Sequence, residues 1–241
     1  MLQNQLQQEI HVWFARPNHA SNPARLDQYR DILSAQETTR YRRFHFSTDS
    51  HHYLIAHALL RHALSKYTDI APTDWTFSYG KHGRPEISNP NVPALRFNLT
   101  HTAGLVGCVV TLDNNCGIDA EAISDRHNPA GVAKRMFSVN ECLEMQQLKG
   151  AAQLDYFFTR WTLREAYVKA RGIGISFPTS KLQFRVDDEA RVEVMFETGL
   201  HENEHDWCFH LLRPTPEHIA AIAVHTRNRP EKKLRVRVIE L

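Results

Sequence analysis

The spacing of apolar residues along the chain predicts several helices of different character. In residues 50–67 the apolar side chains recur at intervals of three and four, which places them on one broad helix face. Residues 24–35 have a more polar amphipathic pattern, and a helical region with one interruption is expected over 128–148. A further helix is expected at 154–170, because the glycines at 172 and 174 are typical of a C-terminal stop.

Alternating or continuously apolar segments between these helices predict β-strands. The strands fall into one group before the polar turn at 113–115 and a second group after it. The expected strands are 11–15, 95–99, 103–112, the segment that carries Asp119 and Glu121, 182–186, 191–196, 207–212, 218–226 and 232–241. The last of these alternates and is basic, as is common at a solvated sheet edge.

Both halves of the chain therefore repeat the order helix, helix, antiparallel strands. No flexible linker separates the halves at 113–115. We expect an α+β fold of two similar lobes, an N-terminal lobe at 1–112 and a C-terminal lobe at 113–241. The internal similarity in sequence is weak, so the idea of a duplication depends mainly on the family resemblance described below.

Composition places the chain among ordinary globular proteins. Of its 241 residues, 42% are hydrophobic and 23% are charged, a balance that gives no sign of disorder. The formal net charge of +2 is too small to favour nucleic acid as a partner. The N-terminus lacks the pattern of a secretory signal, and no apolar stretch approaches the ~20 residues that span a bilayer. We expect a cytoplasmic protein that does not enter the membrane.

The cysteines and histidines raise the question of a metal site. The four cysteines form no CxxC pair, which argues against a disulfide framework or a zinc ribbon. His201, His205 and Cys208 lie close in sequence, but their acidic segment follows Gly199 and has the character of a loop. Because no fourth ligand is suggested nearby, a loop is favoured over a zinc site there.

Two acids alternate with small apolar residues in the segment 117–121, which has the sequence GIDAE. In a strand, successive side chains point to opposite faces, so Asp119 and Glu121 would share one face. On spacing alone, the favoured interpretation of such a face is simple exposure to solvent. The neighbouring segments change that interpretation.

A second acidic segment, WTLREAYVK at 161–169, places Trp161, Glu165 and Lys169 on one helix face. Glu165 and Lys169 alone are an ordinary helix pair worth roughly 0.2–0.5 kcal/mol. Three converging carboxylates, however, repel one another unless a cation lies among them. Carboxylate oxygens, waters and substrate phosphates are the ligands that Mg²⁺ takes. Asp119, Glu121 and Glu165 together therefore predict a magnesium–phosphate site.

A third segment, FNLTHT at 97–102, lies between two expected strands and offers His101 and two hydroxyls. A lone histidine at such a place is more often structural. Hydroxyls and backbone amides at a chain turn are nevertheless good phosphate ligands.

These three segments, FNLTHT, GIDAE and WTLREAYVKARGIGIS, resemble in their order the signature motifs of the 4′-phosphopantetheinyl transferases. The chain length and the two-lobed pattern resemble the Sfp-type branch of that family, and the resemblance extends from about Arg40 to Ser176. It implies a pseudo-dimer of two α+β lobes with the active site at their interface. It also implies an enzyme that uses Mg²⁺ to transfer 4′-phosphopantetheine from coenzyme A to a serine of an apo acyl or peptidyl carrier protein, releasing 3′,5′-ADP.

The resemblance also implies roles for individual residues. Asp119, Glu121 and Glu165 are implied to bind Mg²⁺ at the coenzyme A pyrophosphate, and Lys169 to contact that pyrophosphate. The implied catalytic residues are Glu165, Lys169 and Asp119. Glu165 is also the candidate base for the carrier serine, and the sequence does not decide between base and metal ligand. The residues implied to contact coenzyme A are Arg40, Gly83, Arg84, Pro85, Thr100, His101 and Lys169.

The chain departs from the family pattern at several positions. Arg164 and Arg84 replace lysines, so a planar fork replaces a compact charge. Thr100 occupies a family serine position, and Ala120 is smaller than the usual residue. His52 aligns where the family often has an arginine, which leaves open how the first lobe holds the coenzyme A phosphates.

The sequence leaves several alternatives open for partners and activity. Basic and aromatic residues at 40–46 form a candidate surface for an acidic carrier protein, or their stems cover an apolar helix start. A Mg²⁺-dependent hydrolase of pyrophosphates or phosphodiesters and an inactive carrier-binding relative are the alternative functions. Fatty-acid, polyketide, polyunsaturated-fatty-acid and nonribosomal-peptide carriers all remain candidates. If two lobes mimic a dimer, a monomer is expected.

Overall fold

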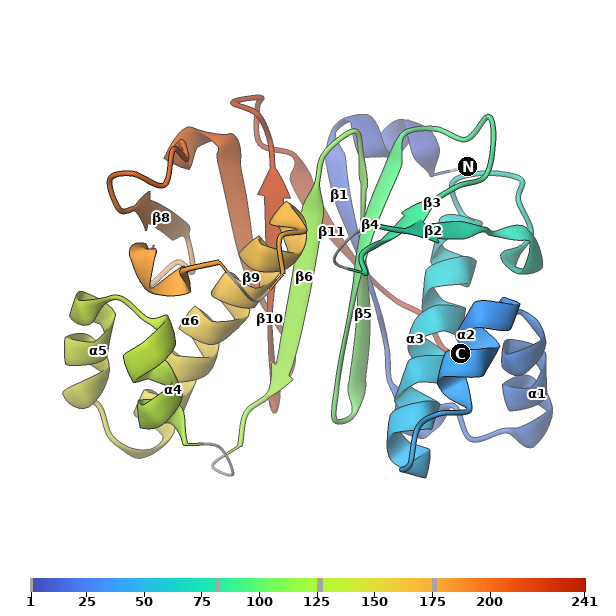
Figure 1. Ribbon diagram of the computed structural model, residues 1–241, viewed down its shortest axis with the longest axis horizontal. Helices are drawn as coiled ribbons and strands as arrows, with labels where there is room; N and C mark the ends of the chain where they lie inside the picture. Colours follow the sequence, from blue (N-terminus) through green and yellow to red (C-terminus); the bar gives the residue numbers. More distant parts are fainter. Residues whose placement is uncertain (1, 81–82, 125–127, 175–176) are drawn as a thin grey trace. The chain divides into compact units, whose positions relative to one another are not determined.

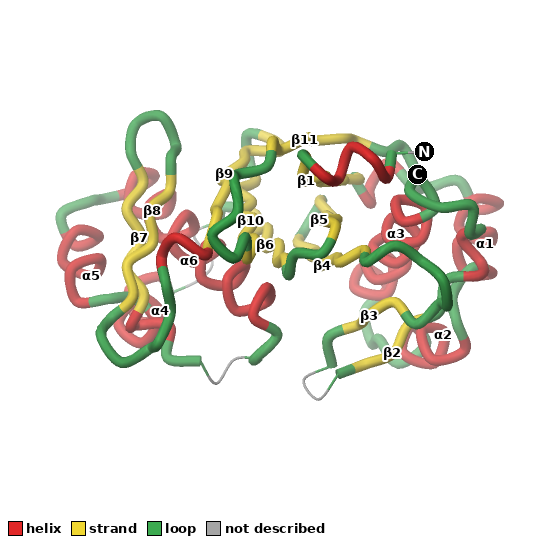
Figure 2. Tube along the Cα trace, turned by 90° about the horizontal axis from the view of Figure 1, so that it is seen from above, coloured by secondary structure: helices red, strands yellow, loops and turns green. Residues whose placement is uncertain are grey.

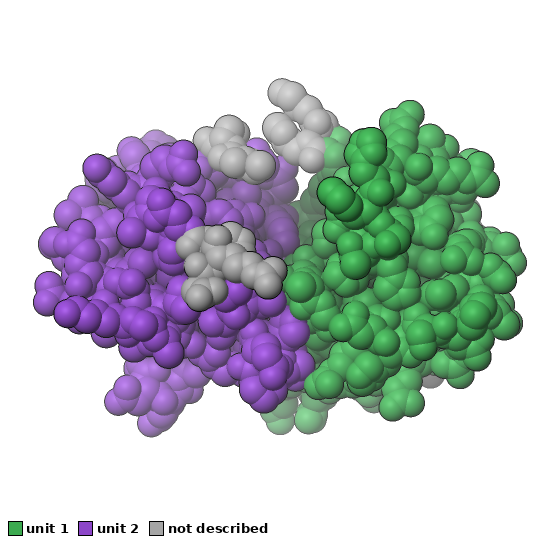
Figure 3. Space-filling model, turned by 90° about the horizontal axis from the view of Figure 1, so that it is seen from below, with its two compact units in different colours: residues 1–114, 232–241 green, residues 115–231 purple. Residues whose placement is uncertain are grey.

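The computed structural model describes residues 2–80, 83–124, 128–174 and 177–241. It divides into two compact units: unit 1 comprises residues 1–114 and 232–241, and unit 2 comprises residues 115–231 (Figure 3). We expected the boundary after residue 112 and assigned 232–241 to the C-terminal lobe. In the structure those last residues group with unit 1, because β11 (Lys233–Val238) pairs in parallel with β1 (Glu9–Ala15).

Unit 1 contains helices packed on a sheet with strand order β11-β1-β5-β4 (Figure 1). Strand β5 is antiparallel to both β1 and β4, and α3 contacts β1, β4 and β5. As expected, β11 is an edge strand of this sheet. The elements besides β1 and β11 are α1 (Pro23–Asp31), α2 (Ala35–Tyr41), α3 (Ser47–Leu64), β2 (Phe77–Tyr79), β3 (Pro85–Ile87), β4 (Leu95–Thr102) and β5 (Leu105–Leu112), with 3₁₀ turns at Gln3–Gln7, Pro17–His19 and Pro72–Asp74.

Unit 2 contains a sheet with strand order β6-β10-β9, and its long helix α6 contacts all of these strands. The antiparallel hairpin of β7 and β8 also packs beside α6 (Figure 2). The elements are β6 (Cys116–Ala122), α4 (Pro129–Met136), α5 (Val139–Gln146), α6 (Gly150–Arg171), β7 (Leu182–Val186), β8 (Val192–Phe196), β9 (Trp207–Thr215) and β10 (His218–His225), with 3₁₀ turns at Thr179–Lys181 and Glu204–Asp206.

The expected helices are present as α1, α3 and α6, and the helical region expected over 128–148 consists of α4 and α5. The short strands β2 and β3 were not expected as strands; they flank the predicted turn at 79–85. Lys81 and His82 of that turn lie outside the described residues. In the parts of the chain that are described, no helix has both the length and the apolar character needed to cross a bilayer.

The two units repeat one order of elements. Each runs from a strand through helices to a short hairpin and then to two antiparallel strands, so β1-α2-α3-β2-β3-β4-β5 corresponds to β6-α5-α6-β7-β8-β9-β10. The last strand of this order, β5 in unit 1 and β10 in unit 2, pairs with the first strand and with the penultimate one, as in β1-β5-β4 and β6-β10-β9. The expected α+β fold of two similar lobes is confirmed.

A buried polar motif also recurs in both units. In unit 1, Ser34 and Glu37 form a capping box at the start of α2, and Glu37 accepts a hydrogen bond from Arg61 of α3 at 2.6 Å. The guanidinium of Arg61 also donates to the carbonyl oxygens of Pro72 and Trp75. Thus one buried ion pair joins α2, α3 and the segment that precedes β2.

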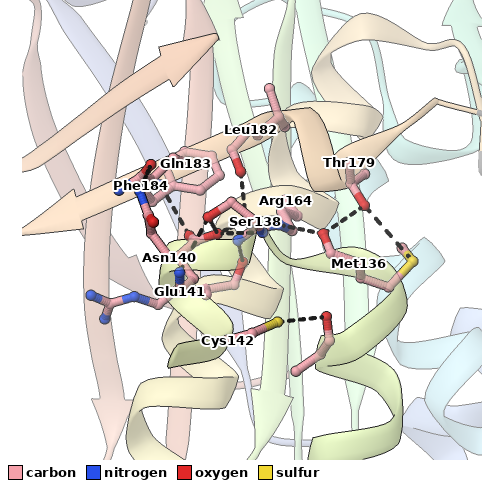
Figure 4. A network of polar contacts seen from close by, with 12 residues as sticks. Met136, Ser138, Asn140, Glu141, Cys142, Arg164, Thr179, Leu182, Gln183 and Phe184 are labelled. Carbon is pink, nitrogen blue, oxygen red and sulfur yellow. Dashed lines mark hydrogen bonds and ion pairs between the residues drawn. The ribbon is translucent and has the colours of Figure 1, made fainter. Parts of the chain in front are cut away.

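Unit 2 contains the corresponding motif around Arg164 of α6 (Figure 4). Arg164 is fully buried, forms an ion pair with Glu141, and donates to the carbonyl oxygens of Met136 at 2.9 Å and Leu182 at 2.8 Å. Glu141 also accepts from the Phe184 backbone amide at 3.1 Å. Although Arg164 precedes Glu165 in a signature segment, its guanidinium is structural, because its contacts connect α6 with α4, α5 and β7.

Replacing Arg164 by Met is expected to lower the free energy of unfolding by about 3–5 kcal/mol, because it leaves the Glu141 carboxylate buried without its ionic partner. Urea unfolding monitored by circular dichroism measures the change. Arg191→Met is the control, since its ion pair with Asp187 is exposed and worth less than about 1 kcal/mol. Equal losses in the two variants would contradict the role assigned to the buried pair.

Candidate active site

Strand β6 and helix α6 approach each other so closely at Gly117 that no side chain fits between them. A Cβ atom at this position would lie 2.1 Å from the carbonyl oxygen of Ala166 and 2.5 Å from the amide nitrogen of Ala170. Both obstacles are backbone atoms, which cannot rotate away as a side chain can. Gly117 therefore sets the distance between the strand that carries Asp119 and the helix that carries Lys169.

Asp119 and Lys169 form an ion pair across this contact. The Nζ atom of Lys169 lies 2.6 Å from Oδ1 of Asp119 and also donates to the carbonyl oxygen of Ile118 at 3.1 Å. Asp119 is only 5% exposed, and its other oxygen, Oδ2, is buried and has no hydrogen-bond partner among the described residues. Burial raises the pKa of Asp119, and the positive charge of Lys169 partly opposes that shift.

Glu121 lies on the same face of β6 and accepts a hydrogen bond from Nε1 of Trp161 at 3.0 Å. Burial, and then the charge of Asp119, raise the pKa of Glu121 to about 7, although the bond from Trp161 opposes the shift. Burial and Asp119 also raise the pKa of Glu165. The expected grouping of Asp119, Glu121, Glu165 and Lys169 is therefore present at the contact between β6 and α6.

The arrangement of Asp119, Glu121 and Glu165 fits a divalent cation, although the three carboxylates are not closely clustered. In the described parts of the chain, Asp119, Glu121 and Glu165 do not form a group of ligand atoms all within 4.8 Å of one another. The unpartnered Oδ2 of Asp119 is nevertheless an acceptor that a cation would satisfy. Mg²⁺ commonly uses one or two carboxylates and completes its shell with waters and substrate phosphates. Asp119 and Glu121 are the candidate carboxylate ligands.

Apart from Lys169 on α6, the residues implied to contact coenzyme A belong to unit 1. Thr100 is buried and His101 is exposed near the end of β4. Arg40, in the last turn of α2, lies 5.8 Å from the centre of the Tyr53 ring. Burial raises the pKa of Tyr79, and the nearby charge of Arg40 partly opposes that shift. Because Tyr79 ends β2, Arg40 lies near the β2–β3 hairpin.

That hairpin carries the expected Gly83-Arg84-Pro85 turn. Gly83 has φ = +75°, a left-handed conformation that favours glycine. Arg84 and Pro85 are half-buried, and β3, which begins at Pro85, contacts β4. Unit 1 thus places Arg40 and this turn close together, and β4, which carries Thr100 and His101, next to the hairpin.

The candidate carrier-binding segment after α2 is only partly buried. Arg42 and Arg43 are exposed, and Phe46 is 70% exposed. The ring of Phe44, in contrast, lies 5.3 Å from that of Tyr53. The segment therefore combines one aromatic anchor with exposed basic and apolar side chains.

Two residues at the site had no assigned role in the sequence analysis. Trp161 was placed on the correct helix face by its spacing from Glu165, but its hydrogen bond to Glu121 was not expected. Gly117 was noted only as the first residue of GIDAE. A glycine inside a predicted strand is itself a signal of close backbone approach, and that signal applies here.

Comparison with known proteins decides the family. A 4′-phosphopantetheinyl transferase of Bacillus subtilis is 30% identical over 198 residues, covering 82% of this chain and 83% of the relative. The chain belongs to the 4′-phosphopantetheinyl transferase superfamily. The model of that superfamily matches residues 115–223, and a model described as 4′-phosphopantetheinyl transferase, N-terminal, matches residues 20–112. The expected transferase of the Sfp type is confirmed.

Other relatives of this 4′-phosphopantetheinyl transferase include Sfp of Bacillus subtilis strain 168, which is 27% identical over 70% of this chain and 73% of the relative. HetI of Nostoc is 30% identical over 71% of this chain and 72% of the relative. A holo-(acyl-carrier-protein) synthase of Bacillus anthracis, solved in complex with CoA (3′,5′-ADP), is 24% identical, with a TM-score of 0.36 over 46% of this chain and 93% of that structure.

Proposed function

We propose that this transferase moves 4′-phosphopantetheine from coenzyme A to a serine of an apo acyl or peptidyl carrier protein, with Mg²⁺ as cofactor and 3′,5′-ADP as the second product. The observation that carries the proposal is the Asp119–Lys169 ion pair, which lies beside Glu121 and Glu165 within the segment that the family model matches. Coenzyme A as substrate and a carrier protein as acceptor follow from the family.

The reaction forms a bond between the serine Oγ and the β-phosphorus of coenzyme A and breaks the bond from that phosphorus to the bridging oxygen. When bound, Mg²⁺ supplies positive charge next to the pyrophosphate. Asp119 and Glu121 would hold the ion. Lys169 would stabilise the charge that develops on the leaving 3′,5′-ADP, since a fixed cation at that position is most effective in a site with little water.

Glu165 is proposed as the base that takes the serine proton, directly or through a water molecule. A base is most effective when its pKa lies near the working pH, and burial together with the Asp119 charge raises the pKa of Glu165. The same carboxylate would also be a suitable third ligand for the ion. Glu165→Gln removes the proposed base and makes the side chain a weaker metal ligand. Glu165→Asp keeps the carboxylate charge but moves it closer to the backbone of α6.

The proposed transfer is tested by intact-protein mass spectrometry of an apo carrier protein after incubation with coenzyme A, Mg²⁺ and the enzyme. We expect a gain of one phosphopantetheine group that EDTA abolishes. No gain with fatty-acid, polyketide and peptide carriers would contradict the proposal. Release of 3′,5′-ADP without an acceptor would instead favour the hydrolase alternative.

The raised pKa of Glu121 predicts a pH-dependent stability for the metal-free enzyme. Between pH 4.5, the ordinary pKa, and about 7, the folded state keeps a proton on Glu121 that the unfolded chain has lost. The folded state then binds more protons, so the free energy of unfolding falls as pH rises through this window. Thermal unfolding in EDTA measures the fall. In Glu121→Gln the stability should depend less on pH, and in the parent enzyme saturating Mg²⁺ should offset the loss of stability. An unchanged dependence on pH in Glu121→Gln would contradict the raised pKa assigned to Glu121.

A further inference from the structure

Cys208, His210 and Glu231 form a compact group of metal-ligating side chains in unit 2. Cys208 and His210 alternate along β9 with Trp207 and Phe209, whose side chains pack in the core around α6. The two potential ligands therefore lie on the sheet face opposite α6, whereas the active-site carboxylates lie on the α6 face. The group is separate from the proposed magnesium site.

The ligand atoms are spaced as one face of a tetrahedral zinc site requires. Sγ of Cys208 lies 3.4 Å from Nε2 of His210 and 3.3 Å from Oε1 of Glu231, and Nε2 of His210 lies 3.9 Å from Oε1 of Glu231. Zinc bonds of about 2.3 Å to sulfur and about 2.0–2.1 Å to nitrogen or oxygen place tetrahedral ligands about 3.3–3.6 Å apart. Two of the distances fall in this range and the third needs a small movement of the exposed Glu231 side chain.

This geometry does not suit a nucleophilic cysteine. In a thiol–imidazole–acid arrangement the thiol contacts one ring nitrogen and the acid orients the ring through the other. Here Cys208 and Glu231 both approach Nε2 of His210, and Glu231 lies closer to the sulfur than to the ring. Burial and the neighbouring Glu231 carboxylate also raise the pKa of the Cys208 thiol, which is the opposite of activation.

We propose that Cys208, His210 and Glu231 bind one Zn²⁺ ion, with water as the fourth ligand. Sulfur and imidazole ligands favour zinc over Mg²⁺, which prefers oxygen. In the described parts of the chain, no other His, Cys, Asp or Glu completes this group, which leaves the fourth position to solvent. Binding forms the zinc–sulfur bond and releases the thiol proton to solvent, so affinity rises with pH.

Zinc would join β9 to the segment that follows β10. Cys208 and His210 are in β9, whereas Glu231 lies beyond the end of β10 at His225. A ligand that binds the folded state and not the unfolded chain raises the unfolding temperature, and the rise grows with the logarithm of the ligand concentration above the dissociation constant. We therefore expect zinc to serve as a structural cross-link and to leave the transfer chemistry unchanged.

Cobalt titration of the untagged enzyme in saturating Mg²⁺ tests the site, because Co²⁺ bound to a thiolate gives a charge-transfer band in the near ultraviolet. We expect the band to saturate at one Co²⁺ per chain and to be reversed by Zn²⁺. Cys208→Ser should abolish it, and Cys142→Ser, at another half-buried cysteine, should leave it intact. No band, or a band that persists in Cys208→Ser, would overturn the proposal.

Glu231→Gln keeps the test informative if Cys208→Ser folds poorly. The Glu231 side chain is 68% exposed, so its replacement does not disturb a core. We expect Co²⁺ affinity to fall about tenfold or more, since even the loss of an outer partner of a metal ligand costs about 10–100-fold. The rise of the unfolding temperature with Zn²⁺ should shrink in parallel. Affinity equal to that of the parent enzyme would show that Glu231 is no ligand and would overturn the three-residue site.

Discussion

Asp119→Asn is expected to lower the kcat/KM of carrier-protein modification by at least about 10²-fold, a loss typical of removing one electrostatic stabiliser of a transition state. The substitution keeps the size of the side chain but removes the charge that pairs with Lys169 and would hold Mg²⁺. Rates measured against Mg²⁺ concentration should show a weaker dependence on the ion as well as a lower maximum.

The fold should survive Asp119→Asn. Asp119 is buried with a raised pKa, so the carboxylate itself is poorly stabilised, and Lys169 keeps its bond to the carbonyl of Ile118. Asp187→Asn, at an exposed acid of unit 2, is the control and should transfer normally. A thermally stable Asp119→Asn enzyme with normal rate and normal Mg²⁺ dependence would refute the metal assignment.

Gly117→Ala is the second change with a large expected effect, and it acts by displacing β6 from α6. The new methyl group would meet the backbone of Ala166 and Ala170, so β6 and α6 must separate. We expect the free energy of unfolding to fall by about 3 kcal/mol, at the upper end of the cost of overpacking a core. We also expect transfer to fall by about 10²-fold, because a displacement of about 1 Å at a catalytic site can have that effect.

Gly80→Ala is the matched control for stability, because the nearest atom to its added Cβ is 3.9 Å away. Urea unfolding and the carrier-modification rate should be measured on the same preparations of Gly117→Ala. If the variant is as stable as the parent enzyme, the two backbones are not in the contact described. If it is destabilised but transfers at the normal rate, Gly117 does not position the carboxylates.

Much of the candidate active site could be predicted from sequence because the patterns that define it are local. Alternation within a strand is enough to put Asp119 and Glu121 on one face, and four-residue spacing is enough to align Trp161, Glu165 and Lys169. The order of three short motifs then indicated the family. The structure adds the distance between the two faces, which depends on the contact of Gly117 with α6.

Other features could not be read from the sequence. Arg164 precedes Glu165 in a signature segment, yet its partner Glu141 is distant in sequence, and only the packed fold reveals the buried pair. His201 and His205 were considered as ligands beside Cys208, but His201 lies in a loop and His205 in the 3₁₀ turn at Glu204–Asp206. Cys208 and His210 share a face of the strand expected at 207–212, but Glu231 is distant in sequence, and only the fold brings it to them.

The sequence by itself determined the α+β character and the family, because these follow from periodicity and from motifs of a few residues. It also indicated the candidate side chains, and the family resemblance indicated the two similar lobes. The tertiary structure decided which unit the C-terminal strand joins, which charged residues are structural, and which atoms meet at Gly117 and at Cys208. These features depend on contacts between residues distant in the chain, and spacing along the sequence does not specify such contacts.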